Sequence, residues 1–433
     1  MTPFEVGIAG VILLFVLLFL GIHIGVGMGL VGFLGLLALN GIDSAMGRLG
    51  HSAFSVTSSY IITVIPLFML MGEFAFFSGL TKEAYEATHK WLSRLPGGMA
   101  MATVGGCAAF AAVCGSNVAT ASTMFAVSYP QMKRYGYGEE MTLGSIAAGG
   151  TIGILIPPSN AFIIYGLVTE QSIGKLFLAG ILPGILLTIL FASTIYLWAK
   201  LKPATGPVGP RFSWRERLKS FQNLWAVIIL FVIVMGGIYS GLFTATEAAA
   251  IGAFAAFVIG FARRRLNAKN VVISFFNAIR ITGMIFMMII GATLFGYFLA
   301  SSGVATALMQ LVIGSAVSPT KVMLAILILF FFLGCFFDAW AIILIIVPIL
   351  YPAILKLGFD PIWFGVILIV MVQMGLITPP IGMNALVVSG MAKDVPTYTT
   401  FRGIIPFCVA MVVCVIILWI FPSIATFLPS GLK

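Results

Sequence analysis

GILIPPSNAF, residues 153–162, places two adjacent prolines and an asparagine inside one of the most apolar stretches of the chain. GLITPPIGMNAL, residues 375–386, repeats this pattern in the second half. A proline inside a helix removes a backbone donor and costs roughly 3 kcal/mol. Each stretch therefore predicts a helix that is interrupted at mid-length, where the carbonyl groups before the prolines lose their helical partners.

The composition around these stretches is that of a membrane protein. Of the 433 residues, 61% are hydrophobic and 8% are charged, whereas a soluble domain carries about 25% charged residues. Apolar runs of the length that a bilayer needs, about 20 residues, recur from end to end. The first run continues to about residue 40 without a cleavage site, so we interpret it as mature structure. We predict an all-α polytopic membrane protein.

Ten apolar segments are predicted to cross the membrane. They lie at 4–20, 24–40, 54–78, 140–166, 178–199, 223–243, 245–261, 281–300, 361–390 and 403–422. Two further segments, 98–130 and 321–355, contain polar or glycine residues at mid-length. We interpret these two as re-entrant hairpins, which enter and leave the membrane on the same side.

The two halves of the chain repeat each other. A shift of 222 residues, and of 224 after an insertion of two, aligns Tyr129-Pro130 with Tyr351-Pro352, Gly153 with Gly375, Pro157-Pro158 with Pro379-Pro380 and Asn160 with Asn384. We divide the chain into a first repeat (1–199, with hairpin 98–130 and broken helix 140–166), a cytoplasmic linker (200–222) and a second repeat (223–433, with hairpin 321–355 and broken helix 361–390).

Charge distribution predicts that the second repeat is inverted. Five true spans in each repeat place the loops 80–97, 131–139, 200–222, 262–280 and 391–402 on one side of the membrane. These loops hold 18 of the 23 lysines and arginines, as the positive-inside rule requires of cytoplasmic loops. Both termini are then periplasmic. The residues left outside are Arg48, Lys175, Lys321, Lys356 and Lys433.

Inverted repeats with interrupted helices are typical of secondary transporters, which bind substrate and coupling ions near the membrane midplane. Non-helical backbone survives at that depth only where it lines a cavity or is buried in protein. The freed carbonyl groups suit a hard cation such as Na⁺. The half-helix after each break presents its positive end to an anion.

The hairpin tips supply polar side chains at the same depth. The first tip reads CGSNVATAS, residues 114–122, and the second reads GCFFDAWAI, residues 334–342. Ser116 of the first tip aligns with Asp338 of the second. Helix capping alone accounts for both residues, although a carboxylate inside the membrane is costly and calls for a partner.

Other candidate residues carry less weight. Glu73 and Glu247 lie near span ends, where they reach the interface or bind neighbouring backbone donors. Gly21, Gly25 and Gly29 predict a helix-packing surface and not a dinucleotide site, because no strand precedes them. The five cysteines and three histidines show no spacing typical of a disulfide framework or a metal site. We find no catalytic constellation and do not predict an enzyme.

At these motifs the chain resembles the M-type large membrane subunit of tripartite ATP-independent periplasmic (TRAP) transporters. The resemblance rests on CGSNVATAS, GGTIGILIPPS, GGIYSGLFTATEAAAIG, GCFFDAWAIILIIVPILYP and GLITPPIGMNAL. It implies uptake of an organic acid, of the sialic acid or C4-dicarboxylate type, across the bacterial inner membrane and driven by Na⁺, with two or more ions. It also implies a Q-type small four-helix subunit, a P-type periplasmic binding protein, and a transport domain that moves as an elevator against a scaffold.

The resemblance also implies site residues. A first Na⁺ site would consist of Ser116, Asn117, Gly153 and Pro157, and a second of Asp338, Gly375, Thr378 and Gly382. Substrate would lie between the two hairpin tips, with Thr120, Ser122, Ser159, Asn160 and Asn384 as candidate contacts. Ala339-Trp340 replaces the Pro-Thr that often follows the family's hairpin aspartate, which leaves the side-chain roles at the second site open.

Three alternatives stay open at this point. A self-sufficient divalent-anion/Na⁺ symporter would transport without a binding protein. A channel would conduct ions faster than a carrier turns over, and two inverted hairpin repeats argue against it. A membrane enzyme would need clustered histidine, cysteine or acidic side chains, which the scattered acids here do not supply.

Overall fold

The computed structural model describes every residue except 305, 308–309, 311–317 and 432–433. Its described residues form helices and connecting loops, and no strand occurs among them. This confirms the all-helical fold class. Lys433, one of the basic residues assigned above to the outer side, lies outside the described residues.

The first half contains the elements α1 (Pro3–Phe19), α2 (Ile24–Asn40), α3 (Ile42–Thr57), η1 (Tyr60–Thr63), α4 (Val64–Phe77), α5 (Leu80–Leu92), α6 (Gly98–Cys114), α7 (Asn117–Arg134), α8 (Glu139–Thr151), η2 (Ile152–Ile154), α9 (Asn160–Thr169) and α10 (Ile173–Leu201). The segment η1 leads directly into α4, so that the two form one apolar span.

The linker and the second half contain η3 (Pro203–Thr205), α11 (Trp214–Asn223), α12 (Trp225–Phe231), η4 (Val232–Gly236), α13 (Gly237–Tyr239), α14 (Ala245–Ala262), α15 (Ala268–Ser302), α17 (Pro319–Gly334), α18 (Ala339–Lys356), α19 (Pro361–Ile377), α20 (Met383–Met391), α21 (Thr397–Ile420) and α22 (Ser423–Ser430).

Both helix interruptions are present at the proline pairs. The first separates α8 from α9, and the second separates α19 from α20. Each contains a cis peptide bond between its two prolines. The helix pairs α6–α7 and α17–α18 form the two predicted hairpins, each folded back through a short turn.

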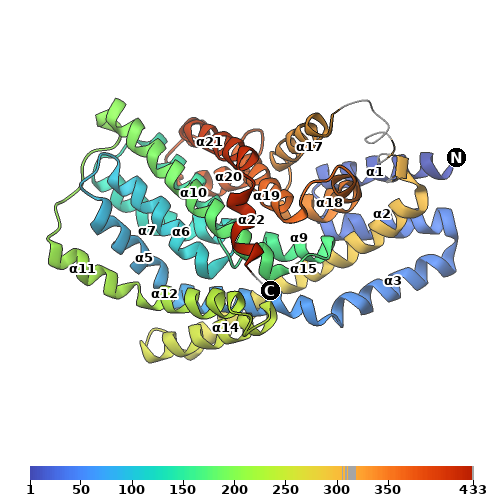
Figure 1. The fold of residues 1–433 in the computed structure, drawn as a ribbon, viewed down its shortest axis with the longest axis horizontal. Helices are drawn as coiled ribbons and strands as arrows, with labels where there is room; N and C mark the ends of the chain where they lie inside the picture. The colour runs from blue at the N-terminus through green and yellow to red at the C-terminus, as the bar shows by residue number, and fades with distance from the viewer. Residues whose placement is uncertain (305, 308–309, 311–317, 432–433) are drawn as a thin grey trace.

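The two halves interlock around these features. The second arm of the first hairpin, α7, packs on α20 behind the second break. Reciprocally, α18 of the second hairpin packs on α9 behind the first break. Each hairpin also packs on the broken helix of its own half. The transport machinery predicted from the sequence is therefore one interdigitated body (Figure 1).

A second group of helices flanks this body. The long helix α15 runs alongside α2 (Figure 1), and α14 packs on α4. A Cβ on Gly25 would lie 2.8 Å from the carbonyl carbon of Met287, so only glycine permits this approach. Gly25 and Gly29 thus belong to a helix-packing surface, as predicted. Gly21 does not, because it lies between α1 and α2 with open space around it.

Six helices of the described chain are long and apolar enough to span a membrane: Tyr60–Phe77, Ile173–Leu201, Ala245–Ala262, Ala268–Ser302, Ala339–Lys356 and Thr397–Ile420. One of them is α18, a predicted hairpin arm, so length alone does not separate an arm from a span. The span predicted at 54–78 begins instead at Tyr60, because α3 continues to Thr57. The amphipathic helices α3 and α5 were not predicted.

The five basic segments lie on one face of the molecule. The linker joins the loops around it through backbone hydrogen bonds from Gly97 to Gly206, from Gly138 to Thr205 and from Gly209 to Ser93. Arg263, after α14, forms an ion pair with Glu83 of α5, with an N–O distance of 2.8 Å. An ion pair between Lys133 and Asp394, at 3.9 Å, joins the last segment, 391–402, to 131–139. The arrangement agrees with a common membrane side for all five.

Candidate functional site: a cavity at the hairpin tips

The first hairpin tip packs directly onto the first break. Ser116 caps α7, since its side chain accepts a hydrogen bond from the backbone of Ala119. Thr120 Oγ1 donates to the Ser116 carbonyl oxygen at 2.6 Å. A Cβ on Gly153 would lie 2.6 Å from this same oxygen and 2.8 Å from Thr120 Oγ1. Glycine at 153 is therefore what lets the break meet the tip.

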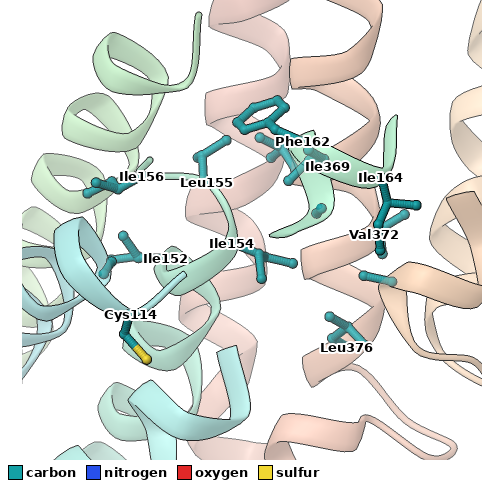
Figure 2. Packing of buried hydrophobic residues seen from close by; sticks show 14 of the residues in the cluster. Cys114, Ile152, Ile154, Leu155, Ile156, Phe162, Ile164, Ile369, Val372 and Leu376 are labelled. Carbon is teal, nitrogen blue, oxygen red and sulfur yellow. The ribbon is translucent and has the colours of Figure 1, made fainter. Parts of the chain in front are cut away.

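The first break is closed and fully buried. Ser159 caps α9 by accepting from the backbone of Phe162, and its hydroxyl donates to the Ile154 carbonyl oxygen. This bond satisfies one of the carbonyl groups that the prolines free. Apolar side chains enclose the break. Figure 2 shows the Ile154 side chain directed toward Val372 of α19.

The second hairpin tip meets the second break through backbone contacts. The Cys335 carbonyl oxygen accepts hydrogen bonds from Ile381 N at 3.2 Å and Gly382 N at 3.3 Å. A Cβ on Gly375 would lie 2.5 Å from Gly334 of the tip. Two separate contacts therefore join this tip to the broken helix, one before the prolines and one after them.

Asp338 caps the start of α18, and Thr378 forms a hydrogen bond to the last turn of its own helix, α19. The Asp338 side chain accepts from Trp340 N at 3.4 Å, and Thr378 Oγ1 donates to the Met374 carbonyl oxygen at 2.6 Å. Capping therefore occurs at both tips, as the simpler interpretation predicted.

A cavity of about 510 Å³ lies between the hairpin tips and the flanking helices. It brings together five predicted site residues: Ser116, Asn117, Ser122, Asn160 and Asp338. The other wall comes from α4 and α15, with Met69, Glu73, Phe76, Asn277 and Met284 among its residues. Side chains from both halves of the chain therefore share one cavity.

The remaining predicted residues lie outside the lining of the cavity. Thr120 and Ser159 are buried and bonded to backbone groups at the first break. Gly153, Pro157, Gly375, Thr378 and Gly382 belong to the breaks behind the tips. Asn384 is fully buried in α20, and neither polar atom of its side chain has a partner among the described residues.

The lining of the cavity contains groups that can bind a cation and groups that can bind an anion. Hydroxyl, amide and carboxylate oxygens of Ser116, Asn117 and Asp338 are the kind of ligand that a hard cation takes. Asn117 starts α7 and Asn160 starts α9, so two helix N-termini with their positive dipole ends border the same space. The described residues hold no cluster of three or more histidine, cysteine or acidic side chains that would bind a transition metal.

The structure adds residues that the sequence did not single out. Asn277 Nδ2 donates to Glu73 Oε2 at 2.9 Å, which joins α15 to α4 at the cavity wall. Glu73 is one of the minor candidates above, whereas the sequence assigns Asn277 to the cytoplasmic loop 262–280. The structure instead places Asn277 within the long helix α15. The other minor candidate, Glu247, forms a capping box with Thr244 at the start of α14, away from the cavity.

Comparisons with known proteins bear on this arrangement. A family model described as "Tripartite ATP-independent periplasmic transporter, DctM component" matches residues 11–424. The C4-dicarboxylate TRAP transporter large permease protein DctM of Pseudomonas aeruginosa is 36% identical over 94% of each chain. The isethionate TRAP transporter permease protein DctMQ of Oleidesulfovibrio alaskensis is 34% identical over 95% of this chain and 64% of its own length.

A sialic acid TRAP transporter permease protein, SiaT of Haemophilus influenzae, is 32% identical over 96% of this chain and 67% of its own length. This chain therefore spans about two thirds of the isethionate and sialic acid relatives. Among solved structures, the YdaH transporter of Alcanivorax borkumensis superposes with a TM-score of 0.65 over 90% of each chain at 15% identity. That similarity supports the fold.

Proposed function

The chain belongs to the family of DctM components of tripartite ATP-independent periplasmic transporters, and from this premise we propose that it is the large membrane subunit of a Na⁺-coupled importer of organic acids. A transporter family excludes the membrane-enzyme alternative. The cavity between the two hairpin tips carries the proposal, because it joins polar groups of both repeats to two helix N-termini. This is the geometry in which secondary transporters bind substrate and ions.

The proposed Na⁺ sites lie at the contacts between tips and breaks. The first comprises Ser116, Asn117, Gly153 and Pro157, and it is supported by the packing of Gly153 against the Ser116 carbonyl group. The second comprises Asp338, Gly375, Thr378 and Gly382, and the bonds from the break to the Cys335 carbonyl group support it. Substrate occupies the cavity between the tips.

The proposed transport step is an elevator movement. The hairpins and broken helices interdigitate into one body, whereas α2, α4, α14 and α15 pack on one another beside it. The cavity lies between the two groups, so sliding of one along the other would carry the cavity across the membrane. Phe76 lines the cavity one residue before α4 ends, and α5 of the basic face follows. This end of the cavity therefore lies toward the face that carries the basic segments.

The proposed assembly contains two partners: a small Q-type four-helix membrane subunit, and a P-type periplasmic protein that delivers the substrate. The family description, which names a tripartite transporter, supports this assembly. The location is the bacterial inner membrane, with both termini on the periplasmic side. Relatives are named for C4-dicarboxylate, isethionate and sialic acid, so the identity of the organic acid stays open.

Uptake into proteoliposomes tests the proposal. The chain is reconstituted with the small subunit and the binding protein of its own transporter, and a labelled organic acid that this binding protein captures is supplied outside. We expect uptake that needs both an inward Na⁺ gradient and the binding protein. Uptake that persists after Na⁺ is replaced by choline contradicts the coupling. Uptake without the binding protein favours the self-sufficient symporter instead.

A further inference from the structure

The charged side chains among the described residues that line the cavity are all acidic. Among the described residues that line it, two are ionisable at neutral pH, Glu73 and Asp338, and none is a lysine, arginine or histidine. The positive potential that this lining offers an acid group therefore comes from the two helix N-termini and from bound Na⁺, and not from a side chain. Here the protein places carboxylates in the substrate's path.

One side of the cavity still suits an acid group. Asn117 is 6% exposed, and its Nδ2 donor has no partner among the described residues. It lines the cavity at the N-terminus of α7, where the helix dipole adds positive potential. A buried donor without a hydrogen bond is costly. We therefore expect the Asn117 amide to donate to an acceptor that enters the cavity.

The opposite wall suits a cation. Glu73 lies within the apolar span Tyr60–Phe77, and Asn277 provides its one hydrogen bond in the described part of the chain. One carboxylate oxygen is therefore left without a donor. Phe76 and Trp340 also line the cavity, and an aromatic face attracts a cationic nitrogen. Glu73 lies about one turn before α4 ends, and an ionisable side chain inside an apolar span is a functional-site candidate whose partner has to be found.

We infer that the substrate carries a positively charged nitrogen in addition to its acid group, as aminosulfonates, amino acids and betaines do. The acid group lies toward Asn117 and the hairpin tips, and the nitrogen lies toward Glu73. This inference rests on the proposed function, since it names the substrate class of the same cavity. Na⁺ bound at the tips would offset Asp338 but not Glu73, which belongs to the flanking helix α4.

Two matched ligand pairs test the inference on the purified full chain in nanodiscs containing Na⁺. Taurine and isethionate differ by an ammonium in place of a hydroxyl group. In the second pair, 4-aminobutyrate and glutarate, an ammonium replaces a carboxylate. Dissociation constants follow from the dependence of the thermal unfolding midpoint on ligand concentration, because a ligand that binds the native state stabilises it by mass action.

We expect the ammonium member of each pair to bind at least tenfold more tightly. Glu73→Gln should reduce that ratio to about one while the Na⁺-dependent shift of the unfolding midpoint is retained. Glu247→Gln is the matched control, because it removes an acidic side chain outside the cavity and glutamine also supports a capping box. It should leave the ratio unchanged.

Several results overturn the inference. They are equal or tighter binding of isethionate and glutarate, absence of stabilisation by any ammonium ligand, and an unchanged ratio in Glu73→Gln. Tight binding and Na⁺-driven uptake of succinate would overturn the inference and leave the proposed function intact. Loss of Na⁺ dependence for every substrate would instead refute the proposed function, whichever ligand binds.

Discussion

The two helix breaks share a sequence pattern but not an environment. In the first, Pro157, Pro158 and Ser159 are all buried. In the second, Pro379 and Pro380 reach the molecular surface and Thr378 is half-buried. The same local chemistry is therefore enclosed by the fold at one place and left open at the other.

The hydrogen bonds at the two breaks also differ. Ser159 closes the first break within its own segment by binding Ile154 and Phe162. At the second break the aligned residue is Ile381, which has no hydroxyl group, and the hairpin tip supplies the acceptor through Cys335. The first break uses its own serine on both sides of the prolines, whereas the second uses its own threonine before the prolines and a neighbouring hairpin after them. We expect the first to behave as a preformed site and the second as an adjustable one.

Gly153→Ala should produce the largest effect. Its new methyl group would meet the Ser116 carbonyl oxygen and Thr120 Oγ1, at a fully buried contact. Overpacking of this kind costs about 1–3 kcal/mol, and we expect the Na⁺ affinity to fall at least tenfold. The measurement is the Na⁺ dependence of the thermal unfolding midpoint. The control is Gly47→Ala, where a Cβ meets nothing within 4 Å.

The equivalent change at the second break sharpens the comparison. Gly375→Ala would bring a methyl group against Gly334, but this hairpin tip borders an open break and can shift. We expect the loss of Na⁺ affinity to be smaller than for Gly153→Ala. An equal or larger loss would remove the distinction between a preformed and an adjustable site.

Asp338→Asn should have the next largest effect. We expect it to lower the Na⁺ affinity and to leave the stability of the fold nearly unchanged. Asparagine caps a helix about as well as aspartate, so the unfolding midpoint without Na⁺ should stay within about 0.5 °C, equivalent to a few tenths of a kcal/mol for a chain of this length. The lost charge should weaken Na⁺ affinity about tenfold, or about 1.4 kcal/mol. Asp360→Asn at the cap of α19 is the control. If both variants bind Na⁺ as the wild type does, Asp338 is a cap only.

Ser159→Ala and Thr378→Val compare a buried with a half-buried hydroxyl group. Removing the Ser159 hydroxyl leaves the Ile154 carbonyl group buried without its donor, which costs about 1–3 kcal/mol. Thr378 lies at a half-buried helix end, so its loss should cost less than about 1 kcal/mol. Thermal unfolding of both variants in one buffer measures the difference. A larger loss in Thr378→Val would reverse the comparison.

Gly382→Ala, the last of these comparisons, tests the backbone conformation at the second break. Gly382 begins α20 with a φ of +58°, a conformation that costs an L-residue about 1 kcal/mol. Gly382→Asn is the matched variant, because asparagine tolerates this conformation better. We expect the alanine variant to unfold at the lower temperature. Equal midpoints would show that the open break relaxes around the substitution.

Several elements of the fold could be read from the chain without coordinates. The proline pairs predicted both interruptions, and the polar tips at 116 and 338 predicted both hairpin turns, because these patterns are local. The helices α3 and α5 were missed, since their polar faces look like loops until a neighbour covers the other face. In α5 the buried side includes Leu80, Ala84 and Tyr85.

The candidate site was predictable in part for the same reason. Ser116, Asn117 and Asp338 stand out as polar residues in apolar segments, and the structure places all three at the cavity. The pairing of Glu73 with Asn277 could not be predicted, because these residues lie 204 positions apart and on different helices. Neither residue has a local motif that points to the other.

The amino-acid sequence by itself determined that this is a polytopic helical protein with a repeated, twice-interrupted core, because hydropathy and proline chemistry act within one segment. Only the tertiary structure decided that the first break is buried, that the first hairpin tip packs against it and that Glu73 lines the cavity at the hairpin tips. Those outcomes depend on side chains from distant segments that compete for the same space, and no single segment contains that information.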